Sequence, residues 1–174
     1  TKVGKFILKD AAENLTKCIL ELGGKNHTIV DKTANIQLAA KRIANTKVLN
    51  CGQTCLAADY IFVEKSVSNQ FIQELKNVLS SLLGADSSTS PEYSRLIHSH
   101  HAQVVLNLLQ GHKDKIIYSP GQADANSRFV PITVVLNPDM NTPLMKEEIF
   151  GPILPIVEYN SFDEVRNYIK QNAK

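Results

Sequence analysis

Apolar residues recur at helical intervals along most of this 174-residue chain, and short runs of β-branched and aromatic residues separate the helical stretches. The helical spacing predicts helices over residues 1–15, 35–49, 66–83 and 101–110, and from residue 161 onward. The other runs predict strands over residues 17–22, 27–30, 59–63, 115–118 and 129–136, where Pro131 indicates an edge position or a bulge. Because strands and helices alternate, the pattern predicts one α/β domain over residues 1–174, with a largely parallel sheet flanked by helices.

Turn-forming and capping residues sharpen the boundaries of these elements. Gly84 and Gly111 each follow a predicted helix, which is the usual place for a terminating glycine. The Gly-Gly pair at residues 23–24 predicts a sharp turn between the first two strands. Ser161 and Glu164 have the spacing of a capping box, which predicts that the last helix begins there.

Composition and charge narrow the classes of function. Charged residues make up 21% of the chain and apolar residues 43%, which is ordinary for a globular protein. The formal net charge of +2 argues against nucleic acid or an anionic membrane as a partner. The three cysteines give no disulfide framework and indicate a reducing, cytoplasmic compartment. No apolar run approaches the ~20 residues of a membrane span, and no signal peptide opens the chain.

The segment Asn-Cys-Gly-Gln-Thr-Cys, residues 50–55, carries the most chemistry, and it joins a predicted helix to a predicted strand. Cys55 therefore lies on backbone fixed at both ends, and Gly52 allows another group to approach closely. A lone cysteine is usually a small buried core residue, so the spacing alone leaves a core role and a nucleophilic role open. Cys51 and Cys55 lack the second pair of ligands typical of a zinc site, so a metal pair is disfavoured.

Other chemical side chains are ambiguous from the pattern alone. Glu21 ends an otherwise apolar predicted strand, where a carboxylate usually turns to solvent. If Glu21 were partly buried, its pKa would rise and it could act as a base near neutrality. Glu148 follows Glu147 on a predicted loop, and adjacent carboxylates on a loop are usually solvated. His98, His100 and His101 lie at a helix start, where solvated histidines are favoured over a metal site because no cysteine or carboxylate completes a ligand set.

Three segments of the chain together resemble the motifs of the aldehyde dehydrogenase superfamily. They are Leu-Glu-Leu-Gly-Gly-Lys at residues 20–25, Asn-Cys-Gly-Gln-Thr-Cys at 50–55 with Ala-x-Asp-Tyr behind it, and Glu-Glu-Ile-Phe-Gly-Pro at 147–152. Their order and spacing match over essentially all 174 residues. Residues 93–97 and 151–156 are most similar to the class 3, fatty-aldehyde branch. The resemblance implies the Rossmann-like catalytic domain of this family.

The resemblance also implies roles for individual residues. Cys55 follows Gly-Gln-x, the position of the family's nucleophile, which forms a thiohemiacetal and then a thioester. Glu21 matches the base for thioester hydrolysis, with Glu148 as the second candidate for that step. Glu148 also matches the carboxylate that hydrogen-bonds the nicotinamide ribose, and Phe150 packs beside that ribose. Gly4 matches the end of a dinucleotide-contacting turn, although its position in a helix alone favours a packing glycine.

The implied reaction is the oxidation of an aldehyde to a carboxylate with NAD or NADP. The implied whole enzyme is a homodimer with a separate dinucleotide-binding domain, and any membrane association would come from segments outside this chain. We therefore expect residues 1–174 to fold as the catalytic domain without turning over alone. The open alternatives are an acylating reductase of the same fold, linked to coenzyme A or phosphate, and a binding module without chemistry. A cysteine peptidase is disfavoured, because no motif places a histidine beside Cys55.

Overall fold

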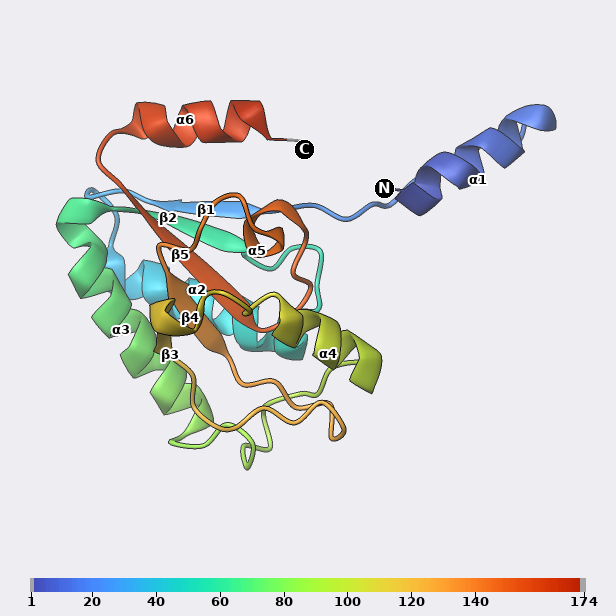
Figure 1. Ribbon diagram of the computed structural model, residues 1–174. Coiled ribbons are helices and arrows are strands. Elements are labelled where there is room, and N and C mark those ends of the chain that lie inside the picture. The colour runs from blue at the N-terminus through green and yellow to red at the C-terminus, as the bar shows by residue number, and fades with distance from the viewer. Residues whose placement is uncertain (1, 173–174) are drawn as a thin grey trace.

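The computed structural model describes residues 2–172, and a five-stranded mixed sheet forms its centre (Figure 1). The strands are β1 (His27–Val30), β2 (Tyr60–Glu64), β3 (Ile116–Tyr118), β4 (Thr133–Leu136) and β5 (Ile153–Tyr159). Their order is β1-β2-β5-β4-β3; the β3–β4 pair is antiparallel and the other pairs are parallel. The predicted α/β fold with a largely parallel sheet is confirmed.

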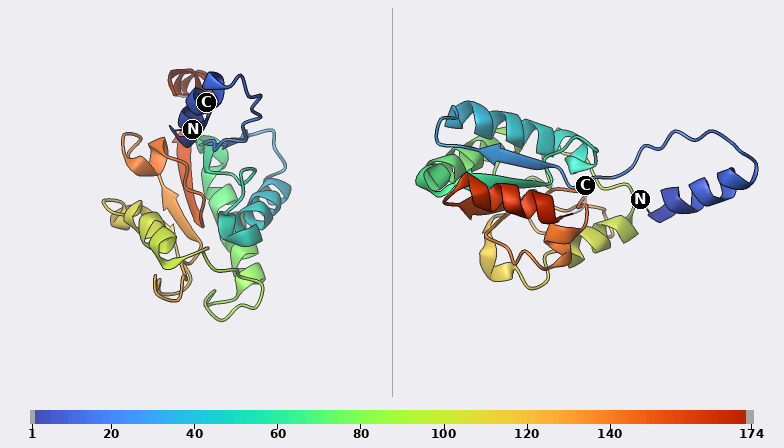
Figure 2. Two further views of the ribbon diagram at one scale, coloured as in Figure 1. Left: turned by 90° about the vertical axis from the view of Figure 1, so that its right-hand side faces the viewer. Right: turned by 90° about the horizontal axis from the view of Figure 1, so that it is seen from above.

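Helices cover both faces of this sheet. The helices of the described residues are α1 (Lys2–Glu13), which stands apart from the sheet, α2 (Ile36–Val48), α3 (Lys65–Leu83), α4 (Ser99–Asn107), α5 (Pro143–Lys146) and α6 (Phe162–Gln171), with 3-10 turns η1 (Leu49–Gly52) and η2 (Lys113–Lys115). In Figure 2, α2 and α3 cover one face, and α4 and α6 lie on the other. Side chains of β2 alternate between two apolar clusters: Ile61 and Val63 join the larger one, and Tyr60 and Phe62 join the one that includes residues of α6. Burial on both faces explains why β2 is a continuous apolar run.

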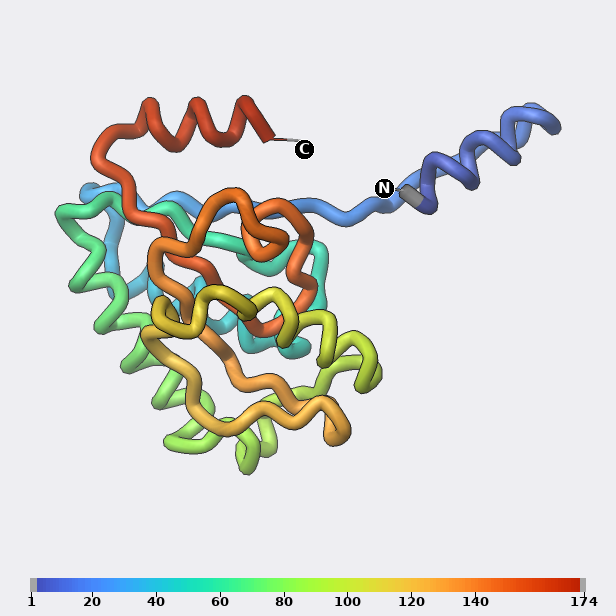
Figure 3. The backbone as a smooth tube through the Cα atoms, in the orientation of Figure 1, coloured from blue at the N-terminus to red at the C-terminus, as the bar shows by residue number. Residues whose placement is uncertain are grey.

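The first helix and the segment after it stand away from the sheet, as the tube in Figure 3 shows. We call α1 together with residues 14–24 the arm. Val3 and Phe6 of α1 are 72% and 69% exposed, so neither side chain is part of the hydrophobic core. Gly4 instead faces the following segment, since a β-carbon at Gly4 would lie 2.9 Å from Leu22 Cδ2. The arm therefore packs partly on itself.

Most of the predicted helices are confirmed. Asn35 is the N-cap of α2, and its side chain accepts the Leu38 N–H at 3.0 Å. Gly84 follows α3 with a φ of 76°, a positive value that glycine adopts at little steric cost, and its N–H bonds the Ser80 carbonyl. The helix predicted over residues 1–15 is α1, and Thr1 lies outside the described residues. In the described part of the chain, no helix has the length and apolar character needed to cross a bilayer.

Three predictions about the strands are wrong. Residues 17–22 form no strand, because they lie beyond the sheet without a neighbouring strand, and Ile19 is 95% exposed. Residues 23–24 continue this irregular segment into β1 rather than turning sharply. The strand predicted over 129–136 begins only at Thr133, and it lies between β5 and β3 rather than at an edge. Proline precedes this strand because it has no N–H to donate to a neighbour.

The start of the last helix was predicted correctly, but its hydrogen bonds differ from a capping box. Ser161 is the N-cap of α6, and its hydroxyl makes no capping hydrogen bond. The Glu164 carboxylate accepts the N–H of Asn160, at 3.3 Å, instead of the N–H of Ser161. The Glu164 carboxylate therefore bonds the residue before the N-cap, and not the N-cap itself as in a capping box.

Candidate active site

Three segments that are far apart in the sequence meet at one edge of the sheet. Residues 20–25 lead into β1, residues 50–55 precede β2, and residues 147–152 precede β5. These strands are parallel neighbours in the order β1-β2-β5, so their amino ends lie at the same edge. Open α/β sheets commonly bind ligands at the opposite edge, outside the carboxyl ends of their strands. The location of this site therefore follows from its motifs and not from that general rule.

An open cleft of about 390 Å³ lies where these segments meet. Its lining residues are Glu21, Leu22, Gly23, Cys55, Glu148 and Phe150. The structure thus brings together four of the predicted site residues. Gly4 lies outside this lining, on α1 and against Leu22, which is the arrangement of a packing glycine.

The two cysteines of the central motif have opposite environments. Cys51 is fully buried, and burial raises the pKa of its thiol to about 11. It is therefore protonated near neutral pH and shielded from solvent. Cys55 is exposed and faces the cleft. Because an accessible thiolate is the reactive form of cysteine, the geometry favours Cys55 over Cys51 as a nucleophile.

The backbone before Cys55 adopts an unusual conformation. Asn50, Cys51 and Gly52 have φ values of 50°, 57° and 70°. The left-handed region costs a residue with a side chain roughly 1–2 kcal/mol, so tertiary contacts must stabilise this turn. A β-carbon at Gly52 would overlap the carbonyl of Gly151. Glycine at this position therefore allows the cysteine loop to contact the segment that carries Glu148.

Gln53 fastens the cysteine loop to the segment before α4, a role that the sequence pattern did not reveal. Its Nε2 donates to the carbonyls of Asn50 and Arg95, at 3.0 and 3.2 Å. Its Oε1 accepts the N–H of Ile97 at 2.9 Å. The glutamine of the Gly-Gln-x-Cys motif was the available signal, and its role in this structure is to position backbone.

An ion pair near the cleft joins the three motifs. Lys25 Nζ contacts the carboxylate of Asp59, and the two side chains are 13% and 6% exposed. The same Nζ donates to the carbonyls of Leu144 and Glu147, at 2.9 and 2.8 Å. Burial lowers the pKa of Lys25, and the charge of Asp59 opposes that shift. Lysine from the first motif and aspartate from the second thereby hold the backbone of the third.

Glu148 lies between two fixed backbone groups. Lys25 binds the preceding carbonyl, and Asp59 accepts the N–H of the next residue, Ile149, at 3.0 Å. The Glu148 carboxylate is packed against Gly23, leaving no room for a β-carbon there. Within residues 2–172 no group donates a hydrogen bond to this carboxylate. Its free acceptors line the cleft, an arrangement that fits paired hydroxyls such as those of a nicotinamide ribose.

Glu21 lines the cleft but is held differently. It lies in the irregular part of the arm and is exposed to solvent. Glu21 therefore lacks, within residues 2–172, the partial burial considered in the sequence analysis. Its backbone neighbours also lack the fixed hydrogen bonds that flank Glu148.

The clustered histidines are part of the architecture around α4. His98 is its N-cap, and the Nδ1 of His98 accepts the His101 N–H at 2.9 Å. Within the described residues, no group of three or more His, Cys, Asp or Glu side chains is placed to hold a metal ion. In this structure His98 stabilises the start of a helix.

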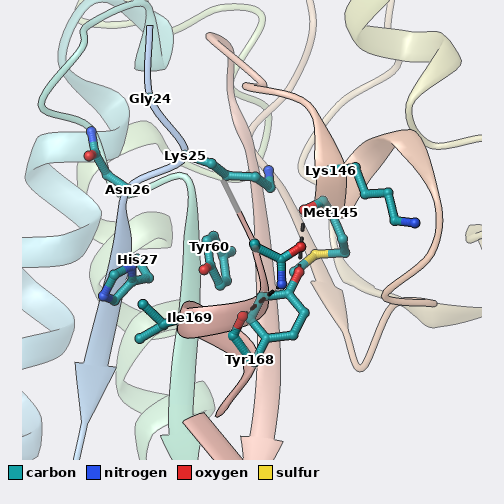
Figure 4. A pocket seen from close by; sticks show the side chains of 10 residues that line it. Gly24, Lys25, Asn26, His27, Tyr60, Met145, Lys146, Tyr168 and Ile169 are labelled. Carbon is teal, nitrogen blue, oxygen red and sulfur yellow. Dashed lines mark hydrogen bonds between the residues drawn. The ribbon is translucent and has the colours of Figure 1, made fainter. Parts of the chain in front are cut away.

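A second hollow, of about 330 Å³, lies beside Lys25 on the α6 face (Figure 4). Its lining residues are Gly24, Lys25, Asn26, His27, Tyr60, Met145, Lys146, Tyr168, Ile169 and Asn172. The Tyr168 hydroxyl closes one side by donating to the Met145 carbonyl at 3.4 Å. This lining includes no thiol and no carboxylate, so the candidate chemistry belongs to the cleft of Cys55.

An exposed cysteine beside two carboxylates on an α/β scaffold is the kind of site found in enzymes that use a cysteine nucleophile. The family model described as "Aldehyde dehydrogenase family" matches residues 1–172, and the chain belongs to this family. The predicted superfamily is thereby confirmed.

Individual relatives agree with this assignment. The chain is 42% identical over 174 residues to the dimeric NADP-preferring aldehyde dehydrogenase of Canis lupus familiaris, covering 100% of the chain and 38% of the relative. It is 41% identical to aldehyde dehydrogenase family 3 member A2 of Mus musculus, covering 100% of the chain and 35% of the relative. The chain thus spans little more than a third of these relatives. The family 3 name of the mouse relative agrees with the predicted class 3 branch.

Solved structures show the same fold. Substrate-bound AldH of Staphylococcus aureus superposes with a TM-score of 0.93 at 39% identity, covering 98% of this chain and 37% of that one. Betaine aldehyde dehydrogenase of the same species, in complex with NAD+, superposes with a TM-score of 0.80 at 28% identity, covering 95% of this chain and 34% of that one. The helices and strands described above are therefore arranged as in aldehyde dehydrogenases.

Proposed function

We propose that residues 1–174 form the catalytic domain of an NAD(P)-dependent aldehyde dehydrogenase that oxidises an aldehyde to a carboxylate. The observation that carries this proposal is the contrast between Cys51, buried with a thiol pKa of about 11, and Cys55, exposed in a cleft with Glu21 and Glu148. The names of the relatives support the aldehyde and the cofactor. The dog relative is called NADP-preferring, and the betaine aldehyde dehydrogenase was solved with NAD+.

In the proposed reaction, the Cys55 thiolate attacks the aldehyde carbonyl and forms a thiohemiacetal. Backbone N–H groups of the loop ending at Cys55 stabilise the oxyanion, and such a donor typically contributes ~10²–10³ in rate. The nicotinamide, when bound, supplies the acceptor for the hydride that leaves this adduct. The thioester on Cys55 then reacts with water, from which a carboxylate takes a proton.

The two carboxylates divide the remaining roles. Glu148, fixed by its flanking backbone hydrogen bonds, accepts hydrogen bonds from the nicotinamide ribose, with Phe150 packed beside it. Glu21 takes the proton from the hydrolytic water, and Glu148 is the alternative for this step. Gly4 is proposed to contact the dinucleotide from α1, although in this structure it packs against Leu22.

The first test compares the two cysteines in a full-length enzyme that carries this chain. Cys55→Ser should lower aldehyde-dependent NAD(P)H formation by at least about 10³-fold, because it removes the nucleophile. Cys51→Ser is the matched control and should retain most of the activity. Equal losses in the two variants would contradict a single nucleophile and favour a dithiol mechanism. Assays with and without coenzyme A would distinguish hydrolysis from acyl transfer.

The second test separates the carboxylates. Glu21→Gln should leave a rapid burst of NAD(P)H followed by a slow steady state, because thiohemiacetal formation and hydride transfer both precede the blocked hydrolysis. Glu148→Gln should instead raise the KM for the cofactor. A slow steady state after a burst in Glu148→Gln, with normal turnover in Glu21→Gln, would assign the base to Glu148.

We also propose that the whole enzyme is a homodimer, because the dog relative is called dimeric. Residues 1–174 alone should fold without aldehyde-dependent turnover, since the chain spans 38% of that relative. Light scattering of the full-length enzyme and steady-state assay of residues 1–174 would check these two expectations.

A further inference from the structure

Phe150 occupies an unfavourable backbone conformation at the edge of the cleft. Its φ is 46°, in the left-handed region that a residue with a side chain rarely adopts. It lies between the buried residues Ile149 and Gly151, and the residue itself is 40% exposed and lines the cleft. Such a conformation persists only where neighbouring groups stabilise it.

Two side chains of α4 contact this backbone. His101 Nε2 lies 2.8 Å from the carbonyl oxygen of Phe150. Val105, one helical turn further on, lies so close to Gly151 that a β-carbon there would be 2.9 Å from its Cγ2. Because residues four apart share one face of a helix, α4 presents both contacts to the same turn.

The helix that provides these contacts is itself tied to the cysteine loop. Gln53 Oε1 accepts the N–H of Ile97 at 2.9 Å, just before the helix begins. The N-cap His98 accepts the N–H of His101 at 2.9 Å. A continuous set of hydrogen bonds therefore connects the loop of Cys55, through α4, to the carbonyl of Phe150.

We propose that His101 is a positioning residue for the cofactor side of the cleft. Its Nε2–H donates to the Phe150 carbonyl and thereby holds the Phe150 ring and the adjacent Glu148 opposite Cys55. A carbonyl oxygen only accepts, so Nε2 carries the proton in the neutral ring, and it keeps that proton when the ring is charged. The contact therefore persists in both charge states. This inference rests on the proposed cofactor roles of Glu148 and Phe150.

The test uses the full-length enzyme and variants that separate the donor from the bulk of the side chain. His101→Leu removes the donor at similar size, and it should raise the KM for NAD(P) about 5- to 10-fold, the effect of one lost hydrogen bond. The change in kcat should be under about 3-fold, because Cys55 is untouched. His101→Gln places an amide N–H at a similar reach and should return the KM to within about 3-fold of the parent enzyme. His100→Leu is the matched control on the neighbouring exposed position and should leave the KM unchanged.

Two further measurements make the result decisive. If His101→Leu does not fold, His101→Asn replaces it, because its amide is too short to reach Phe150 and should raise the KM in the same way. Alkylation of Cys55 without cofactor should proceed at the parental rate in all these variants. A KM in His101→Leu or His101→Asn equal to that of His100→Leu would overturn the proposal, as would an equal rise in His101→Gln. Cys55→Ser is assayed in parallel: full activity there would overturn the proposed function itself, a result distinguishable from failure of the His101 role alone.

Discussion

The two walls of the cleft are built in different ways. One wall carries Cys55, Glu148 and Phe150 and belongs to the body of the domain. The other wall, residues 21–23, belongs to the arm. The body wall is fixed by Lys25, by Gln53 and by contacts from α4, whereas Glu21 is exposed on a segment without regular structure.

This difference places the proposed nucleophile and its proposed base on parts of the chain with unequal structural support. Hydrogen bonds from distant parts of the sequence fix the body wall within the described residues. Within residues 17–24, by contrast, backbone groups make no hydrogen bond to the sheet. The position of Glu148 relative to Cys55 is thus determined by this fold, whereas the position of Glu21 depends on how the arm packs. The predictions below test that contrast.

The largest effect is expected from breaking the ion pair behind the body wall. Lys25→Met leaves the Asp59 carboxylate nearly buried without its partner, and this should lower the free energy of unfolding by about 3 kcal/mol. Lys32→Met is the matched control, because Lys32 pairs with Glu64 at 3.7 Å with its own side chain 66% exposed. The control should change stability by less than about 1 kcal/mol. Urea denaturation measures both, and similar losses would mean that Lys25 does not fix the body wall.

A glycine in the cysteine loop should have the next largest effect. Gly52→Ala combines a φ of 70° with overlap against Gly151, and we expect a loss of about 2–3 kcal/mol and of most activity. Gly111 is the matched control, since its φ of 80° is similar and no atom lies within 4 Å of a β-carbon placed there. Gly111→Ala should cost about 1 kcal/mol. If thermal unfolding shows the same loss for both variants, the contact between Gly52 and Gly151 is unimportant.

A third substitution tests the place where the two walls touch. Gly23→Ala puts a methyl group where the Glu148 carboxylate lies, and the flexible carboxylate should move. We expect the KM for NAD(P) to rise about 5-fold through loss of one hydrogen bond to the cofactor, with stability nearly unchanged. Gly24→Ala is the control, because its nearest contact would be an ordinary 3.6 Å to Asn26. Equal KM values for the two variants would show that Gly23 does not set the position of Glu148.

The smallest effect concerns acid stability of the body. His112 is buried, its Nε2 contacts the Thr142 hydroxyl at 3.1 Å, and its Nδ1 has no partner among the described residues. Burial, followed by the nearby charge of Lys115, lowers the pKa of His112 from 6.5. The unfolded chain therefore binds a proton at a higher pH than the folded one, so stability should fall as the pH drops below about 6.5.

Replacing the His112 imidazole tests this pH dependence through the slope of the unfolding free energy between about pH 6.5 and 5. His112→Gln should reduce that slope. Denaturant titrations at a series of pH values measure it, and an unchanged slope in His112→Gln would assign the acid sensitivity to other groups.

Local sequence determined much of this protein. The apolar periods of residues 35–49 and 66–83 predicted α2 and α3, because helices depend on neighbours within one or two turns. The resemblance of the Gly-Gln-x-Cys segment to the family's motif, and not its spacing alone, indicated Cys55 rather than Cys51 as the candidate nucleophile. The three motifs identified the family, which the matches confirm.

Tertiary structure decided the rest. Residues 17–22 have the composition of a strand, but a strand requires a partner, and the sheet begins only at β1. No local pattern indicates that β5 lies between β2 and β4, yet this order places residues 147–152 beside Cys55. The hydrogen bonds from Lys25 to the Glu147 carbonyl and from His101 to the Phe150 carbonyl join residues far apart in the chain. They can form only after the sheet has brought those residues together.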